Sequence, residues 1–195
     1  MYYKIIAKTF VRVPPSNFGK DVKGTILSLL NEQFTNYVSE RLGIVISVLE
    51  ILETGEGVII PGDGAAYHDT RFVLLAFKPE VQEMVLGTIS EITDFGAFMD
   101  LGAIEGMIHV SQAMDDFVSF SKSNVLTGKE SKKVLKVGDK CRARIIAVSF
   151  KDLANPKVGL TMRQPLLGAM NWVDEELKAS SKVVEEKEKP SKKEK

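Results

Sequence analysis

The sequence predicts an α+β protein: a small antiparallel sheet with one main helix, then a five-stranded β-barrel and a short terminal helix. Residues near the start alternate between polar and apolar as in a strand, and helical periodicity follows. Farther on, short apolar runs are separated by glycines at turn and bulge spacing, as in a tightly coiled barrel. These glycines are Gly87, Gly96, Gly102 and Gly106. We therefore divide the chain into residues 1–80, 81–165 and 166–195.

The first part begins with an alternating strand, Tyr2–Val13, which the following Pro-Pro pair ends. A helix comes next, with Ser16 or Asn17 as the expected cap and Gly43 beyond its C-terminal end. Its apolar positions recur at helical spacing: Val22, Ile26, Leu29, Leu30 and Val38. Three later runs are expected strands: Ile44–Leu52, Gly57–Ile60 and Arg71–Phe77. One helix packed on a small sheet is the expected arrangement.

A glycine-rich tip loop is expected over residues 55–68, because turn-forming residues are denser there than one hairpin needs. A phosphate-binding loop is excluded: a dinucleotide fingerprint would need a third glycine where Ile60 stands, and no Lys followed by Ser or Thr comes after Gly64. Two interpretations remain, a protruding hairpin that docks onto a partner or a plain Asp-Gly turn. The candidate docking residues are Gly55, Gly57, Gly62, Asp63 and Gly64.

The barrel strand after Gly96 is expected to carry aromatic side chains on its outer face. Because strand side chains alternate, Phe98 is expected to face solvent. A bulge at Gly96 would bring Phe95 to the same face, and on the next strand His109 is expected to point outward. The expected inward side chains are Ala97, Met99, Leu101, Ile108 and Val110.

Exposed rings on such a barrel form a stacking platform for single-stranded nucleic acid, since every base has a π-face. We name Phe95, Phe98 and His109 the aromatic platform. The alternative is that both Phe residues belong to the core and that His109 is a hydrogen-bonded strand histidine. The glycines around the three residues favour the platform.

The last two barrel strands and the segment before them bring basic residues. Arg142 and Arg144 are expected to face outward, and Val158–Met162 is the expected last strand. The side chains expected to alternate with the two arginines are Cys141, Ala143, Ile145 and Ala147. Residues 129–144 hold two acids and seven bases: Lys129, Lys132, Lys133, Lys136, Lys140, Arg142 and Arg144. This stripe either follows a phosphate backbone or is a solvated lysine loop.

Composition excludes several classes of protein. With 195 residues, 44% hydrophobic residues and no net charge, the chain is typical of a globular protein and not of an electrostatic DNA binder. It shows no apolar run of the roughly 18–20 residues that span a membrane and no leader segment, so we expect a cytoplasmic location and no membrane partner. The single cysteine excludes an internal disulfide, and we expect Cys141 to be a small buried hydrophobe. With only two histidines, no metal cluster is expected. No cofactor and no catalytic constellation are expected.

Two segments lie outside the barrel strands. Residues 115–136 exceed the length of a barrel loop and are expected to extend the partner or RNA surface, with the Asp115 and Asp116 carboxylates solvated rather than bound to a cation. From Asp174 onward, seven acids and seven bases predict a frayed or disordered tail. Trp172 is either a partner contact or a core residue. A short amphipathic helix is expected to pack through Leu167, Met170, Val173 and Leu177.

The barrel region closely resembles the S1 domain, an oligonucleotide-binding barrel of ribosomal, exosome and polymerase proteins. The four glycines named above carry this resemblance together with Phe95, Phe98, His109, Val110 and Ser111. The resemblance implies single-stranded RNA as the ligand. Around the final hairpin, where the family carries an acidic residue and an arginine for RNA contact, this chain has Ser149 and Lys157. Lys157 joins Arg142 and Arg144 in the expected RNA-binding set.

A second resemblance runs in order along about residues 1–177. Its motifs are Val13-Pro14-Pro15 with Phe18-Gly19, the Gly55–Gly57 and Pro61–Tyr67–His68 loop, Asp115-Asp116, and Leu160–Pro165 with Gly168 and Trp172. Together they resemble the family of the larger stalk subunit of archaeal RNA polymerase, E-prime, the counterpart of the seventh subunit of eukaryotic RNA polymerase II.

This resemblance implies a non-catalytic polymerase subunit. Its tip loop would contact the polymerase core near the clamp, its S1 domain would hold nascent single-stranded RNA near the exit path, and a smaller F subunit would form a heterodimer with it. Such a stalk assists promoter opening and influences elongation and termination. The alternative is a free-standing S1-type RNA-binding factor of the exosome or translation machinery, with an S1-containing nuclease as a more distant third. The chain's start and tip loop together favour the polymerase subunit.

Overall fold

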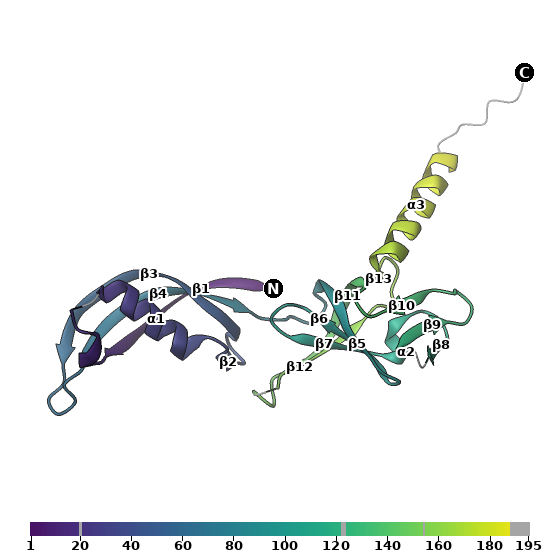
Figure 1. The fold of residues 1–195 in the computed structure, drawn as a ribbon. Coiled ribbons are helices and arrows are strands. Elements are labelled where there is room, and N and C mark those ends of the chain that lie inside the picture. Colours follow the sequence, from purple (N-terminus) through teal and green to yellow (C-terminus); the bar gives the residue numbers. More distant parts are fainter. Residues whose placement is uncertain (20, 122–123, 154, 188–195) are drawn as a thin grey trace, which may run out of the picture. The chain divides into compact units, whose positions relative to one another are not determined.

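The computed structural model describes residues 1–19, 21–121, 124–153 and 155–187. The chain divides into two compact units (Figure 1). The first contains residues 1–79 together with the segment around residues 150–155, and the second contains residues 80–149 and the chain from Pro156 onward. Each unit has its own hydrophobic core.

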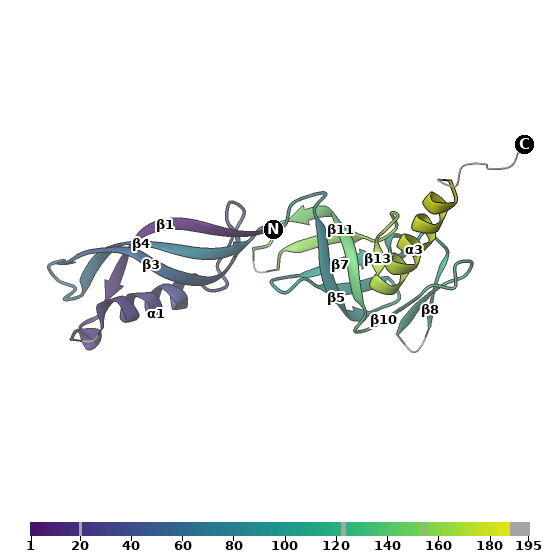
Figure 2. The same ribbon diagram turned by 90° about the horizontal axis from the view of Figure 1, so that it is seen from above.

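The first unit is an antiparallel sheet with one helix against it (Figure 2). Its strands lie in the order β1-β4-β3-β2, and a short 3-10 turn follows β1. The sheet and helix enclose the core, so the predicted architecture of this part is confirmed. The elements are β1 (Tyr2–Val13), the 3-10 turn (Pro15–Asn17), α1 (Val22–Phe34), β2 (Val38–Ser39), β3 (Gly43–Ile59) and β4 (Ala66–Phe77).

The core of the first unit lies between α1 and the middle strands. Ile26 and Leu30 of α1 are fully buried, as is Phe72 of β4. A polar contact adds to this packing: Asn31 Oδ1 accepts a hydrogen bond of 2.9 Å from the backbone N–H of Val48 in β3. The helix is therefore tied to the sheet by both apolar and polar contacts.

Both expected limits of α1 are wrong. The helix is capped by Asp21, whose carboxylate accepts hydrogen bonds from the N–H groups of Lys23 (3.2 Å) and Gly24 (3.1 Å), whereas Ser16 and Asn17 lie in the separate 3-10 turn. The helix also stops before Val38. Asn36 has a left-handed φ of 63°, which turns the chain so that Val38 pairs with Ile44 in the sheet.

The strand β3 is longer than predicted and joins two expected strands into one of 17 residues. Its pairing with β4 continues through four register shifts, the last between Thr54 and Gly57, so that extra residues are absorbed as bulges. Gly55, Gly57 and the partner segment at His68 therefore lie in strands, and the connecting turn covers only residues 60–65. The tip loop expected over residues 55–68 is a long hairpin with a short turn.

The second unit contains a closed five-stranded barrel, as predicted. Its strands lie in the order β12-β7-β6-β5-β11, and β11 also pairs with β12, which closes the sheet. The β7–β12 pairing is parallel, and the other barrel pairings are antiparallel. The barrel strands are β5 (Met84–Ile92), β6 (Gly96–Asp100), β7 (Glu105–His109), β11 (Lys140–Ser149) and β12 (Lys157–Thr161).

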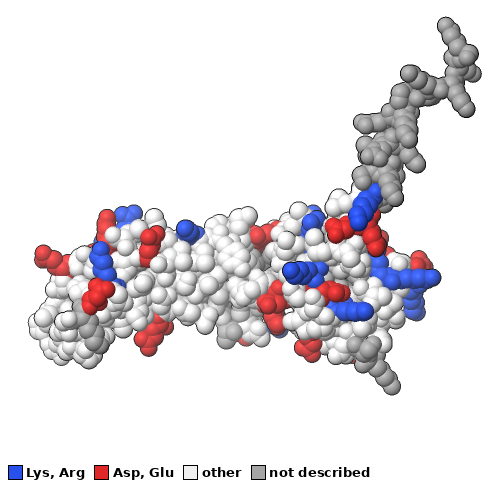
Figure 3. All heavy atoms as spheres, turned by 45° about the horizontal axis from the view of Figure 1, so that its top comes forward, with Lys and Arg blue, Asp and Glu red and all other residues white. Residues whose placement is uncertain are grey.

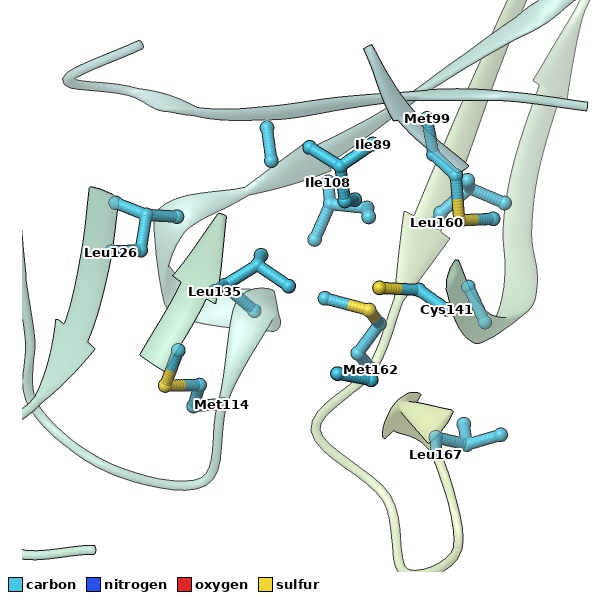
Figure 4. Close-up of a cluster of buried hydrophobic side chains, with 14 of the residues drawn as sticks. Ile89, Met99, Ile108, Met114, Leu126, Leu135, Cys141, Leu160, Met162 and Leu167 are labelled. Carbon is cyan, nitrogen blue, oxygen red and sulfur yellow. The ribbon is translucent and has the colours of Figure 1, made fainter. Parts of the chain in front are cut away.

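Figure 4 shows the barrel core, where side chains of several strands meet. Cys141 is buried as predicted, and burial raises the pKa of its thiol to about 12. The expected inward side chain of Ala147 is instead exposed, because a bulge between Ile145 and Ala147 reverses the alternation along β11. Val110 is only half-buried and begins a short helix instead of continuing β7. The other predicted inward residues are buried: Ala97, Met99, Leu101, Ile108, Ala143 and Ile145.

The segment between β7 and β11 forms a three-stranded sheet of its own, with the order β10-β9-β8. Leu126 and Leu135 from this sheet are fully buried and extend the barrel core. The segment is thus the predicted excursion, but it is folded and packed on the barrel. Its elements are α2 (Val110–Ala113), β8 (Val118–Ser121), β9 (Val125–Gly128) and β10 (Val134–Lys136).

The two acids at the start of this segment make contacts within the protein. The Asp116 carboxylate accepts hydrogen bonds from the N–H groups of Glu130 and Ser131, both at 2.9 Å, and these bonds, with that from Ser131 foremost, lower its pKa. Asp115 forms an ion pair of 2.8 Å with Arg163. Asp116 is therefore held by backbone groups and not merely solvated, whereas the Asp115 side chain is 74% exposed, as expected, and also pairs with Arg163.

The C-terminal segment adds a short strand to the barrel and then a helix. The strand is β13 (Gly168–Ala169), which pairs with β11, and the helix is α3 (Met170–Lys187). Trp172 is buried in the core, whereas Leu177 of the predicted apolar stripe is 46% exposed. Of the two interpretations left open for Trp172, the core role is the one observed.

The prediction of a frayed or disordered tail from Asp174 onward is wrong for residues 174–187, because α3 continues to Lys187. Between Met170 and Lys187 the sequence has no glycine or proline and is rich in Glu and Lys, which favour helix. The rest of the tail, residues 188–195, lies outside the described residues.

Substitution of Gly96 by Ala is expected to lower the free energy of unfolding by about 1–3 kcal/mol. A Cβ at this position would collide with the carbonyl oxygen of Ile108 on β7. The matched control is Gly159→Ala in β12, where a Cβ would stand 3.5 Å from Ala147 Cβ, an ordinary contact. The control should change stability by less than about 0.5 kcal/mol. Urea denaturation followed by circular dichroism measures both, and equal stability of the two variants would contradict the expectation.

Candidate nucleic-acid interface and docking tip

The two phenylalanines of the aromatic platform lie together on the barrel. Phe98 is half-buried on β6 and pairs with Met107 of β7, and Phe95 is 46% exposed. Their ring centroids are 6.0 Å apart with an interplanar angle of 85°, an edge-to-face contact. The rings thus form one aromatic surface, as the sequence predicted.

Phe95 reaches this surface by a different route from the one expected. Gly96 pairs regularly with His109, and the register shift between β5 and β6 lies at Ile89 and Glu91 instead of at Gly96. Phe95 belongs to the turn before β6, where its carbonyl oxygen accepts a hydrogen bond of 2.9 Å from Val110 N–H. The close approach of β6 and β7 at Gly96 lets this turn fold against the end of β7.

His109 lies at the end of β7 and is exposed. Its Nδ1 lies 2.8 Å from Ser111 Oγ and accepts the Ser111 N–H at 3.3 Å, so His109 caps α2. A neutral imidazole that accepts at Nδ1 carries its hydrogen on Nε2. The exposed ring therefore offers a hydrogen-bond donor beside the two phenyl rings. Sequence reasoning missed this capping role, although a Ser two residues after a His at a strand end is a usable signal.

The predicted basic residues are placed unevenly around the platform. Arg142 and Arg144 pair with Leu86 and Met84, at the opposite end of β5 from Glu91, the residue that pairs with Phe98. Arg144 also pairs with Thr161 of β12, which follows the β12 residue paired with Ile108. Arg144 Nε is buried and has no hydrogen-bond partner among the described residues.

Lys157 lies on β12, the strand that pairs with β7 of the platform. It is exposed at the start of β12, two residues before Gly159. Gly159 pairs with Met107, the cross-strand neighbour of Phe98. Lys157 therefore lies on the barrel surface that carries the aromatic side chains.

Part of the basic stripe over residues 129–144 makes contacts within the protein. Lys133 forms an ion pair of 2.8 Å with Glu176 of α3, and its Nζ lies 5.5 Å from the centre of the Trp172 ring. This contact with Lys133 lowers the pKa of Glu176. Figure 3 shows acidic and basic side chains interspersed on the face in view, so this face has no continuous positive track.

The turn of the β3–β4 hairpin is held by a cluster of three polar side chains. Arg12 of β1 donates two hydrogen bonds to Asp63, of 2.8 Å and 2.6 Å, and Tyr67 donates a third from its hydroxyl at 2.6 Å. The hydrogen bond from Arg12 is the main reason why the pKa of Asp63 lies below its usual range. Gly62 and Gly64 supply the left-handed backbone of the turn, with φ of 98° and 68°. The turn is thus tied to β1.

The other two glycines of the predicted docking set have a packing role. A Cβ on Gly57 would stand 2.8 Å from the ring of His68, and a Cβ on Gly55 would stand 3.3 Å from the carbonyl oxygen of Asp69. His68 Nδ1 also lies 3.0 Å from the Gly55 carbonyl oxygen. Both glycines let the two strands of the hairpin approach closely.

Exposed apolar side chains stand directly before the turn. Val58, Ile59 and Ile60 are 63%, 61% and 48% exposed. Sequence reasoning concentrated on the glycines and missed these three residues, although an apolar run against a glycine-rich turn was visible. Exposed apolar side chains of this size are typical of interaction sites in soluble proteins.

Other site types are absent from the described part of the chain. There, no group of three or more His, Cys, Asp or Glu side chains could hold a metal ion. Within the same residues, no helix has the length and apolar character needed to cross a membrane.

Comparison with protein families identifies both units. Residues 8–64 match the family described as the SHS2 domain found in the N terminus of Rpb7p/Rpc25p/MJ0397. Residues 78–151 match the S1 RNA binding domain. The resemblance to the S1 domain is confirmed. The SHS2 match includes β3 of the hairpin, and the S1 match includes the aromatic platform.

Curated relatives extend the match along the chain. DNA-directed RNA polymerase subunit Rpo7 of Saccharolobus solfataricus is 38% identical over 89% of this chain and 97% of the relative. DNA-directed RNA polymerase III subunit RPC8 of Saccharomyces cerevisiae is 36% identical over 53% of this chain and 49% of the relative. Small ribosomal subunit protein bS1 of Leuconostoc lactis is 33% identical over 79% of this chain but only 34% of the relative. The extent of the first match shows that the chain belongs to the Rpo7 family of DNA-directed RNA polymerase subunits.

Proposed function

We propose that the chain is a non-catalytic stalk subunit that docks on the RNA polymerase core through its β3–β4 hairpin and holds nascent single-stranded RNA on its S1 barrel. In this role it pairs with the smaller F subunit and assists promoter opening, elongation and termination. The observation that carries the RNA-holding part is the aromatic platform, because edge-to-face rings and an exposed imidazole occur together on the outside of an S1 barrel.

The architecture of the platform is suited to a single-stranded transcript of any sequence. Stacking on an aromatic ring contributes about 1–3 kcal/mol per base and does not depend on sequence, which suits a protein that must accept any transcript. The Nε2–H of His109 can donate to a phosphate or to the edge of a base. Lys157 provides a cation on the same surface, in the region where the family carries an arginine.

The docking role is supported by the combination of a held turn and an apolar surface. The Arg12–Asp63–Tyr67 cluster fixes the turn, so the three apolar side chains beside it are already ordered before a partner binds. Val58, Ile59 and Ile60 offer the apolar area that an interface core requires. We assign docking to these three side chains. The turn glycines give the turn its shape.

Apolar surface is also available for the smaller F subunit. Ile6 and Phe10 of β1 are 57% and 69% exposed, and β1 lies at the edge of its sheet. Such an edge strand can accept a partner chain through backbone hydrogen bonds and side-chain packing.

The proposal is tested by crosslinking in an elongating polymerase reconstituted with this chain. A transcript that carries 4-thiouridine beyond the exit channel should crosslink to the chain, and the crosslinked peptides should map to β6, the preceding turn and β7. Replacing both phenylalanines of the platform by Ala should abolish most of the signal. Crosslinks confined to the N-terminal unit would contradict the proposal.

A further inference from the structure

The most exposed large apolar side chain among the described residues is Phe117, which is 77% exposed and follows Asp116 in the excursion. Neither the barrel core nor the hairpin explains it. An exposed phenyl ring favours association with a planar or apolar ligand. The surroundings of Phe117 indicate which kind of ligand can reach the ring.

Phe117 lines a recess of about 360 Å³ on the second unit. Val110, Ser111 and Val118 form part of its lining, and Arg163 lies at one side. Ser111 is also the residue that hydrogen-bonds His109 Nδ1, at 2.8 Å. The recess therefore begins where the aromatic platform ends.

We propose that an RNA strand leaving the aromatic platform passes over α2 and stacks a further base on Phe117, so that the excursion provides a second RNA subsite. This inference rests on the proposed function, because the first subsite is the platform itself. Ser111 Oγ, which belongs to both surfaces, can hydrogen-bond a base edge or a ribose hydroxyl at the junction.

The charges around Phe117 favour stacking as the main interaction. Asp115 is paired with Arg163 at 2.8 Å, and the Asp116 carboxylate is engaged by backbone N–H groups. Lys129, whose N–H donates to the Phe117 carbonyl oxygen at 2.9 Å, places one exposed cation beside the ring, next to Glu130. With these charges nearly balanced, removing the ring should weaken RNA binding without changing its salt dependence.

The test measures binding of fluorescent oligouridylates to the full chain by anisotropy, with lengths of about 4 and about 12 nucleotides, within the range of about 4–16 for one barrel of this class. We expect Phe117→Ala to lower the affinity for the longer oligonucleotide about fivefold or more and to leave the affinity for the shorter one unchanged. Phe117→Trp should retain binding, since it keeps a stacking surface. The matched control is Phe18→Ala, which removes a 47% exposed ring from the first unit and should change neither affinity.

The outcomes separate this inference from the proposed function. If Phe117→Ala leaves both lengths unchanged while Ala at Phe95 and Phe98 weakens both, the second subsite is overturned and the platform stands. If Phe117→Ala instead weakens binding of the smaller F subunit with RNA affinity intact, the ring belongs to a protein interface and the inference fails. If substitutions in the platform have no effect on RNA affinity, the proposed RNA-holding function fails and the second subsite with it.

Discussion

Replacing Phe95 and Phe98 together by Ala should weaken binding of single-stranded RNA by about 25-fold or more, since two stacked bases lose about 1–3 kcal/mol each and 1.4 kcal/mol corresponds to tenfold. The rings contact each other edge to face, so either substitution also exposes the other ring. Anisotropy with an oligouridylate at fixed salt measures the change. Salt must be held constant because phosphate contacts respond to it.

Two controls make this result specific. Phe18→Ala removes a ring of matched exposure, 47% against 46% for Phe95, from the N-terminal unit and should leave RNA affinity unchanged. Leu at both platform positions keeps apolar volume but removes the π-faces, so it should bind RNA as weakly as the Ala variant. Wild-type affinity in the double Leu variant would show that the rings serve packing and not base stacking.

Replacing Val58 and Ile59 together by Asp should lower affinity for the polymerase core a hundredfold or more. Both side chains are more than half exposed in the free chain, so the acids are tolerated there. Because successive strand residues point to opposite faces, the pair places an acid on whichever face of the hairpin meets the core, and a carboxylate buried there without a partner costs several kcal/mol. Binding to immobilised core enzyme measures the effect. RNA affinity should not change, because the substitutions lie in the other unit.

The matched control for this pair is Val81→Asp, which places an acid on a side chain that is 55% exposed, 22 positions after Ile59 and in the other unit. It should bind the core as the wild-type chain does. Equal loss in the control and the hairpin variant would mean that added negative charge, and not the hairpin surface, lowers the affinity.

Features that depend on local alternation could be predicted from sequence. The strand over residues 2–13 and the outward position of Phe98 each follow from a period of two, and the glycine spacing predicted five barrel strands. The prediction failed where one extra residue reverses the pattern. Ala147 is exposed because a bulge precedes it, and β3 continues through a glycine-rich segment because its bulges keep the pairing with β4.

Contacts between distant residues could not be read from spacing. Arg12 and Asp63 are 51 positions apart, and only the β1–β4 pairing brings them together. The position of Trp172 in the core likewise depends on how α3 packs. For the candidate site, alternation predicted the outer position of Phe98, but it could not show that Arg142 and Arg144 pair with Leu86 and Met84 of β5. The sequence shows that an arginine faces outward but not which side of a closed barrel it faces.

The most direct test of the account is affinity purification of the tagged chain from its native cells, followed by quantitative mass spectrometry. We expect the large RNA polymerase subunits and the smaller F subunit to be recovered in stoichiometric amounts. With the Val58→Asp, Ile59→Asp chain, the large subunits should be lost while the smaller subunit remains. Recovery of ribosomes or exosome in place of polymerase, or full retention of the core by the hairpin variant, would contradict it.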